Sequence, residues 1–225
     1  TREIGKYGYM TWKQIKEVAA SDLVTIGNHS HTHEYLIDWE DDKIKSDLIT
    51  SIQIFKKELG YSPKIFSYPF GEYSINLKKI VADLNFEFAF GQHSGVIDPT
   101  KNFLELPRFP INEKYGDLDR FSFVISLFPL QYKNIKPIDK FISKNNNPPE
   151  MIIEFFDEQQ NLKNINCFSN EGDKWDKSKI KLDNNKLIIE FRDKFIFRRG
   201  RINCSLKDDI GWRWLGFQFS IESIN

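Results

Sequence analysis

Three of the chain's four histidines lie within five residues, in the segment 27–33 (Gly-Asn-His-Ser-His-Thr-His). Neutral imidazole is the commonest protein ligand for zinc and similar divalent ions. The segment follows a short apolar run at residues 23–26, which predicts a strand ending at the mouth of an α/β fold, where ligand sites usually form. A lone histidine is more often a core or surface residue, but three at alternate positions are hard to explain by packing. The segment therefore predicts a metal site.

The spacing of the histidines indicates which of them share an ion. If the chain turns helically after His29, then His29 and His33 lie on one face and can chelate one ion, whereas His31 points away. Ser30 and Thr32 would then orient the ligand rings. The metalloprotease helix signature is absent, because no Glu follows His29. A catalytic metal needs about three protein ligands and an open position for water, so at least one carboxylate must come from elsewhere.

The elements around the histidines alternate as in βα units, which predicts a parallel sheet with right-handed connections. A Thr11–Gln14 capping box starts one helix, and Gly60 ends another whose apolar residues recur at three- and four-residue steps. Helices are predicted at residues 11–20, 40–59 and 74–84, and strands at residues 23–26, 65–66 and 86–90. Each candidate segment follows a predicted strand, which is where barrel enzymes place their chemistry.

The second part of the chain has a different pattern. Residues 145–149 (Asn-Asn-Asn-Pro-Pro) are typical of a linker. After them come period-two runs rich in aromatic and β-branched residues, at residues 151–156, 186–192, 195–197 and 214–221. The sequence thus predicts two domains, an α/β domain at residues 1–144 and a small antiparallel β domain, a sandwich, at residues 145–225.

The β-rich part has no motif that indicates a function. Trp175, Trp212 and Trp214 suit a sugar-stacking platform, since exposed aromatic faces match carbohydrate rings. The favoured interpretation is that they fill the core of the sandwich, because Trp is usually mostly buried.

Composition excludes several classes of partner. The 225 residues are 40% hydrophobic and 15% aromatic, enough to bury a sizeable core. Lys plus Arg equals Asp plus Glu, 32 each, so nothing indicates a nucleic acid or an anionic membrane as partner. No apolar run approaches the roughly 20 residues of a membrane span, and no signal peptide is visible.

The histidine segment resembles a family motif. Asn28-His29-Ser30 followed by Thr32-His33 is similar to the His-Ser/Thr-x-x-His motif of the polysaccharide deacetylases (the NodB-homology family of chitooligosaccharide, peptidoglycan and chitin deacetylases). Residues 10–15 resemble the helix before that motif. Residues 66–71 resemble the family's Arg-x-Pro-aromatic-Gly loop, and residues 106–110 resemble its later Arg-bearing segment. The resemblance covers about residues 7–112 and implies a partial (β/α) barrel of the polysaccharide deacetylase type.

Two departures from the family pattern bear on function. The family's Thr-Phe-Asp-Asp-Gly strand supplies a metal-ligand Asp and a catalytic base, and no such pair precedes His29. Asp41-Asp42 lies downstream, on a predicted helix. We therefore expect the base and a third ligand upstream of Thr1, and little deacetylase activity from these 225 residues alone. Ser67 also replaces the Arg of the loop, as in the poly-N-acetylglucosamine deacetylase branch.

The resemblance implies roles for the loop that contains Pro69. The backbone N–H of Phe70 would donate to the developing oxyanion. The predicted substrate-binding residues are Tyr68, Pro69, Gly71, Glu72 and Tyr73.

Two later residues are further catalytic candidates. His93 would give a proton to the leaving amine in place of the family's usual histidine, with a surface loop histidine as the alternative. The resemblance implies that Arg108 pairs with the catalytic Asp. The alternative for Arg108 is a surface ion pair with Glu105 or Glu113.

The resemblance implies a metal-dependent hydrolase that removes N-acetyl groups from a glycan containing N-acetylglucosamine. Its cofactor would be one divalent ion held by His29 and His33, zinc by first choice, with cobalt or manganese as alternatives. Two other functions stay open: an inactive homologue that binds glycan, and a hydrolase of another amide or ester. Substrates of this kind lie outside the cytoplasm, in the periplasm or cell envelope. In that compartment Cys167 and Cys204 would form a disulfide, whereas in the cytosol both would be free thiols.

Overall fold

The computed structural model describes residues 1–157 and 161–222 and divides into two compact units. The first contains Thr1–Gly91 and Asn102–Leu106, and the second contains Gln92–Lys101 and Pro107–Asn225. The end of the predicted second domain, residues 223–225, lies outside the described residues. No helix within the described residues is long and apolar enough to cross a membrane.

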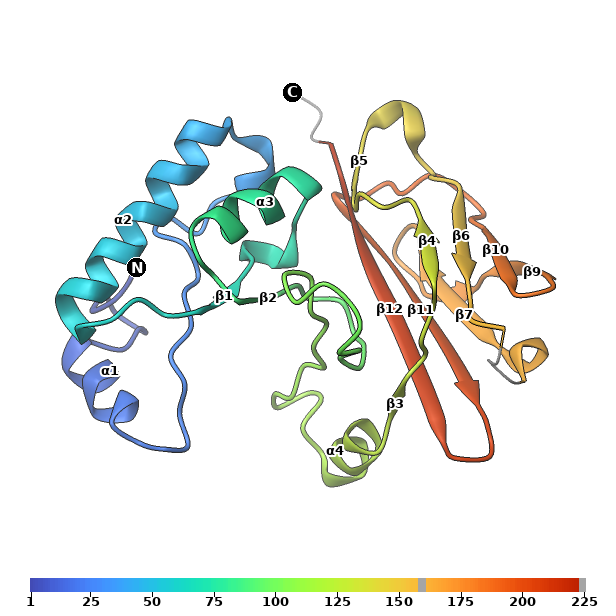
Figure 1. The fold of residues 1–225 in the computed structure, drawn as a ribbon, viewed down its shortest axis with the longest axis horizontal. Coiled ribbons are helices and arrows are strands. Elements are labelled where there is room, and N and C mark those ends of the chain that lie inside the picture. Colours follow the sequence, from blue (N-terminus) through green and yellow to red (C-terminus); the bar gives the residue numbers. More distant parts are fainter. Residues whose placement is uncertain (158–160, 223–225) are drawn as a thin grey trace. The chain divides into compact units, whose positions relative to one another are not determined.

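The first unit is a small parallel sheet with helices, as predicted for an α/β fold (Figure 1). Strand β1 (Ile65–Ser67) pairs in parallel with β2 (Phe88–Phe90). Isolated parallel bridges, Asn28 to Phe66 and Phe90 to Leu106, extend this pair on both sides. The described residues therefore form an open arc of parallel segments rather than a closed barrel.

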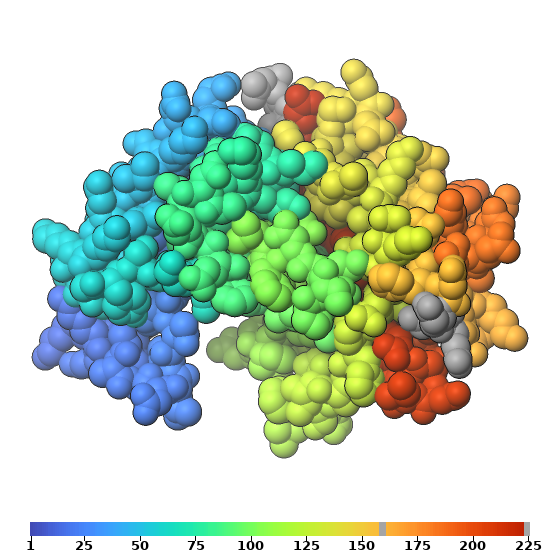
Figure 2. Space-filling model, viewed as in Figure 1, coloured from blue at the N-terminus to red at the C-terminus, as the bar shows by residue number. Residues whose placement is uncertain are grey.

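The three predicted helices of this unit are confirmed. They are α1 (Trp12–Ala19), α2 (Asp41–Leu59) and α3 (Ile75–Asp83). Thr11 and Gln14 form both bonds of the capping box, Gly60 ends α2 in the left-handed conformation, and the Ser74 hydroxyl caps α3. The side chains of α2 and α3 meet in one continuous surface (Figure 2).

The prediction of a strand over residues 23–26 is wrong. These residues have no ladder partner among the described residues, and Leu23 is 96% exposed. Only Asn28 joins the sheet: its N–H donates to the carbonyl of Ile65, and its carbonyl accepts from the N–H of Ser67. An apolar run alone does not make a strand, because a strand needs a neighbour to take up its backbone groups.

The second unit is a β-sandwich. One sheet has the order β4-β6-β10-β9 and is antiparallel throughout. The other has the order β3-β12-β11-β7-β8, with β5 also paired to β12; β3 and β5 run parallel to β12. The bounds are β3 (Phe128–Pro129), β4 (Asn134–Lys136), β5 (Phe141–Ile142), β6 (Met151–Glu154), β7 (Asn166–Asn170), β8 (Asp176–Lys177), β9 (Lys179–Asp183), β10 (Lys186–Glu190), β11 (Arg199–Lys207) and β12 (Trp212–Ile221). A short helix, α4 (Leu118–Ile125), precedes β3.

Side chains from both sheets form a single core. Met151, Ile153 and Leu187 of one sheet and Leu206 and Phe219 of the other are fully buried within it. Cys167 and Cys204 face each other across β7 and β11 and form a disulfide, as expected for an oxidising compartment. The disulfide therefore joins neighbouring strands inside the sandwich.

The second unit begins before the division predicted at Lys144. Strand β4 adds to the edge of β6, and β5 pairs with the end of β12. Because Leu130 and Ile142 enter the sandwich core, this stretch belongs with the β-rich unit by packing. The predicted linker, residues 145–149, connects β5 to β6 within the unit.

Three of the four predicted strands of this region are present, as β6, β10 and β12. Residues 195–197 form no strand, because Phe195 turns into the core. The Phe195 ring lies against Gly200, and a Cβ atom at position 200 would fall 1.9 Å from Cδ1 of Phe195. The interpretation of the tryptophans as core residues is wrong for Trp175 and Trp212, which are 45% and 40% exposed.

Candidate metal centre

The imidazoles of His29 and His33 lie side by side at the carboxyl ends of the parallel segments. Their ring centroids are 4.7 Å apart and the ring planes are 70° apart. Both residues are exposed. His29 directly follows Asn28, which bridges β1, so the end of the sheet places the first ring. Two rings at this separation are close enough to be ligands of one ion.

The ring of His29 has a fixed tautomer. Its Nδ1 lies 2.6 Å from the carbonyl oxygen of Ser67, the last residue of β1. A carbonyl only accepts, so Nδ1 carries the proton and donates. The nitrogen with ligand character is therefore Nε2, and the hydrogen bond to Ser67 orients the ring as outer-shell carbonyls do in metal sites.

The loop between the two histidines is not the helical turn that we predicted. Ser30 and His33 both have positive φ, 63° and 59°, and the chain from 29 to 35 contains no helical residues. The Ser30 hydroxyl accepts a hydrogen bond of 2.9 Å from the N–H of His33. The loop that carries the two rings thus contains two left-handed residues in place of a helical turn.

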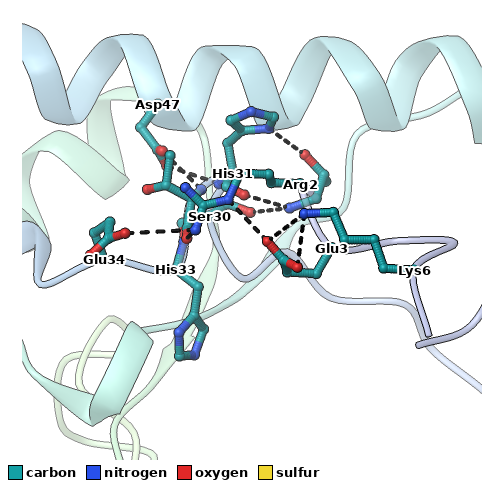
Figure 3. Close-up of polar contacts among 10 residues, drawn as sticks. Arg2, Glu3, Lys6, Ser30, His31, His33, Glu34 and Asp47 are labelled. Atoms are coloured by element: carbon teal, nitrogen blue, oxygen red, sulfur yellow. Dashed lines mark hydrogen bonds and ion pairs between the residues drawn. The ribbon is translucent and has the colours of Figure 1, made fainter. Parts of the chain in front are cut away.

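The other predictions for this loop have mixed outcomes. His31 points away from His33, as predicted, and its Nδ1 lies 2.8 Å from the hydroxyl of Thr1 (Figure 3). Ser30 acts on the backbone of His33 rather than on a ligand ring. The Thr32 hydroxyl is buried without a hydrogen-bond partner among the described residues, so it orients no imidazole.

The donor set fits a divalent ion in part. Two imidazoles, one with a fixed tautomer, match the ligands that zinc prefers. No group of three His, Cys, Asp or Glu side chains suited to hold an ion occurs within residues 1–157 and 161–222. The third ligand is thus not supplied by the described residues in this arrangement.

Phe70 lies beside the histidine pair. It belongs to a short 3-10 turn (Pro69–Gly71) after β1 and has a positive φ of 58°. Its ring contacts His33 edge-on at a centroid distance of 4.7 Å and stacks on Tyr35 at 4.1 Å. Tyr35 is a site residue that no sequence motif indicated. An aromatic residue two positions after a histidine carries no signal of its own, since only folding brings it onto Phe70.

Most of the predicted substrate contacts are core residues. Tyr68 is fully buried; its hydroxyl donates to the Leu104 carbonyl at 2.9 Å, and burial raises its pKa. Tyr73 and Glu72 are 2% and 3% exposed. These three side chains have no surface open to a sugar, so a substrate-contact role does not fit the geometry. Pro69 and Gly71 are also buried and shape the turn that places Phe70.

His93 and Arg108 belong to the second unit. His93 is 4% exposed and stacks on Phe217. Burial, with smaller contributions from the charges of Lys140, Arg201 and Arg108, lowers its pKa to about 3. A neutral imidazole has no proton to give as an imidazolium at neutral pH, so the role of general acid does not fit. Arg108 is exposed; its N–H donates to the His93 carbonyl at 3.0 Å.

The low pKa of His93 predicts a pH dependence of stability. In the unfolded chain the pKa of this histidine is about 6.5, whereas in the folded chain it is about 3. Between these two pH values the unfolded chain binds a proton that the folded chain does not bind. Stability is therefore lost as the pH falls below about 6.5, by about 2 kcal/mol at pH 5. Urea unfolding at pH 7 and pH 5 measures this, with His93→Gln as the control. Equal losses in both proteins would contradict the assignment.

A cavity of about 650 Å³ adjoins the histidine loop in the first unit. Apolar residues Ile4, Ile15, Ile26 and Phe55 form part of its wall. The segment 29–33 forms another part. The site thus borders a largely apolar hollow as well as solvent.

The first unit is thus an α/β module with two neighbouring histidines at the carboxyl ends of its parallel segments. Residues 1–89 match the profile of the polysaccharide deacetylase family. A relative, the peptidoglycan-N-acetylglucosamine deacetylase of Bacillus cereus, is 32% identical over 72 residues, which are 32% of this chain and 26% of that protein. The chain thus matches about a quarter of the length of this relative.

Two solved structures are similar to part of the chain. The Streptococcus pyogenes deacetylase PplD, in complex with acetate, is 24% identical, with 48% of this chain and 47% of that chain covered and a TM-score of 0.45. IcaB from Ammonifex degensii is 22% identical, with 50% and 54% covered and a TM-score of 0.44.

Proposed function

We propose that the chain is part of a metal-dependent carbohydrate N-deacetylase that acts on a glycan containing N-acetylglucosamine. The observation that carries the proposal is the His29–His33 pair within a segment that matches the deacetylase family. The named activity of the Bacillus cereus relative is consistent with this substrate class.

His29 and His33 would hold the ion, zinc by first choice and cobalt or manganese as alternatives. The chemistry supplied by a bound ion of this kind is Lewis-acid polarisation of the acetamide carbonyl and a lower pKa for a water. The Ser67 carbonyl keeps His29 in the tautomer that this role needs.

Phe70 would stabilise the developing charge on the acetamide oxygen through its backbone N–H. Its contacts with Tyr35 and His33 hold the turn beside the histidines and offset the cost of its positive φ.

An extracytoplasmic location fits this function. The disulfide between Cys167 and Cys204 is of the kind that persists in oxidising compartments. Glycans of the cell envelope lie in such compartments.

The test uses the natural protein that contains these 225 residues, with oligomers of N-acetylglucosamine as substrate. We expect the protein to release acetate and leave the glycan backbone intact, and we expect a chelator to stop this release. The His29→Ala variant should release no acetate. Oligomer binding without acetate would instead favour the inactive glycan-binding homologue. Acetate released only from O-acetyl esters would favour another hydrolase.

A further inference from the structure

Asp47, on α2, is a buried carboxylate that contacts the histidine loop. It is 7% exposed. One carboxylate oxygen accepts the backbone N–H of His31 at 2.8 Å, and the other accepts the N–H of Thr32 at 3.0 Å (Figure 3). Hydrogen bonds from N–H groups to an ionised carboxylate are shorter and stronger than those between neutral groups. Asp47 therefore holds the part of the loop that lies between the two proposed ligands.

Ser51 makes a second contact from the same helix face, one turn further along α2. Its hydroxyl lies 2.8 Å from the Asn28 side-chain oxygen and 3.3 Å from the Ser30 carbonyl. The Asn28 oxygen also accepts the N–H of Ser30 at 3.0 Å. Asn28, Ser30 and Ser51 are all buried. Helix α2 thus binds the loop at its start and at its middle.

The loop needs such support because of its backbone. Ser30 and His33 both adopt left-handed conformations, which non-glycine residues adopt only where the surroundings hold them. His33 itself is exposed, and its ring position follows from the backbone that carries it. A loop released from α2 would let the two rings separate.

We infer that Asp47 is a positioning residue of the metal centre, which sets the separation of the His29 and His33 rings through the amides of His31 and Thr32. This inference rests on the proposed function. Asp47 is not itself a ligand here, because both of its oxygens accept backbone N–H groups. Outer-shell partners of this kind typically change metal affinity by about 10- to 100-fold when mutated.

The test compares Asp47→Asn with Asp42→Asn in the full chain. In Asp47→Asn, the side-chain NH₂ group would face one of the two backbone N–H groups, so one hydrogen bond would be lost. Asp42, the control, is a fully exposed carboxylate on the same helix. Cobalt binding by titration gives the affinity, and hydrogen exchange gives the protection of the His31 and Thr32 amides. We expect Asp47→Asn to bind cobalt about 10- to 100-fold more weakly and to exchange both amides faster. Asp42→Asn should match the unmodified protein in both.

A third variant separates positioning from general loss of stability. Val81→Ala changes a residue in the core of the same unit. It should lower the stability of the protein but leave its cobalt affinity unchanged, and it should not selectively speed amide exchange at residues 31 and 32. Wild-type affinity in Asp47→Asn would overturn the inference and leave the proposed function standing. If the unmodified protein bound no divalent ion, the proposed metal centre would fail and the inference with it.

Discussion

We expect the affinity for zinc or cobalt to fall by more than about 100-fold when either His29 or His33 is replaced by alanine, beyond the range typical of outer-shell changes. Each variant removes one of two imidazoles whose centroids lie 4.7 Å apart. No third His, Cys, Asp or Glu is grouped with this pair in the described part of the chain. A single exposed imidazole holds an ion weakly, so turnover should fall together with affinity.

His31→Ala is the matched control for these variants. The ring of His31 points away from His33 and contacts Thr1. We expect this variant to keep its metal affinity to within a few-fold, while circular dichroism shows that all three variants are folded. If His31→Ala lost as much affinity as the other two, His31 would contribute to the metal site as well, and the assignment of the His29–His33 pair as the protein ligands would be wrong.

Loss of the Cys167–Cys204 disulfide should lower the free energy of unfolding by roughly 4 kcal/mol. The two cysteines are 37 residues apart. A cross-link across a loop of this length restricts the unfolded chain, and its removal restores that chain's entropy. Such a loss would be a large part of the roughly 5–15 kcal/mol that typically stabilises a domain.

Urea unfolding of the oxidised protein, the reduced protein and the Cys167→Ala/Cys204→Ala variant measures this effect. The reduced protein keeps every side-chain atom, so the difference between it and the double variant reports the cavity left by the sulfur atoms. Equal unfolding free energies for the oxidised and reduced proteins would contradict the prediction. Two freely alkylated cysteines in the natural protein, isolated without reductant, would show that the disulfide does not form.

Local signals in the sequence were sufficient for the helices of the first unit. The capping box at Thr11, the left-handed stop at Gly60 and the cap at Ser74 each act within a few residues, so their outcome needs no knowledge of the fold. The spacing of His29 and His33 likewise indicated a pair, although the chain reaches it through two left-handed residues rather than a helical turn.

Features that depend on distant neighbours were not predictable in this way. The run at residues 23–26 has the composition of a strand but no ladder partner in the described structure. Strand β11 was missed because Arg199, Gly200 and Arg201 mask its alternation of buried residues, although Ile202, Cys204 and Leu206 carry that pattern. The burial of Tyr68, Glu72 and Tyr73 also depends on packing that follows from tertiary structure.

The site residues that were missed share this origin. Tyr35 stacks on Phe70 from another part of the sequence, and Asp47 reaches the histidine loop from α2. Neither forms a motif with the residue that it contacts. Sequence spacing therefore predicted the proposed ligands but not the residues that hold them in place.

The hydrogen bond that orients His29 has a consequence for how this site can evolve. The acceptor is the main-chain carbonyl of residue 67, which every amino acid has. The resemblance to the family places an arginine at this position, where the chain has Ser67. The side chain at position 67 can therefore differ between related proteins and gain or lose a contact with substrate. The imidazole of His29 keeps its proton on Nδ1 in either case. A change in substrate specificity and the retention of His29 as the proposed metal ligand are therefore separable at a single residue.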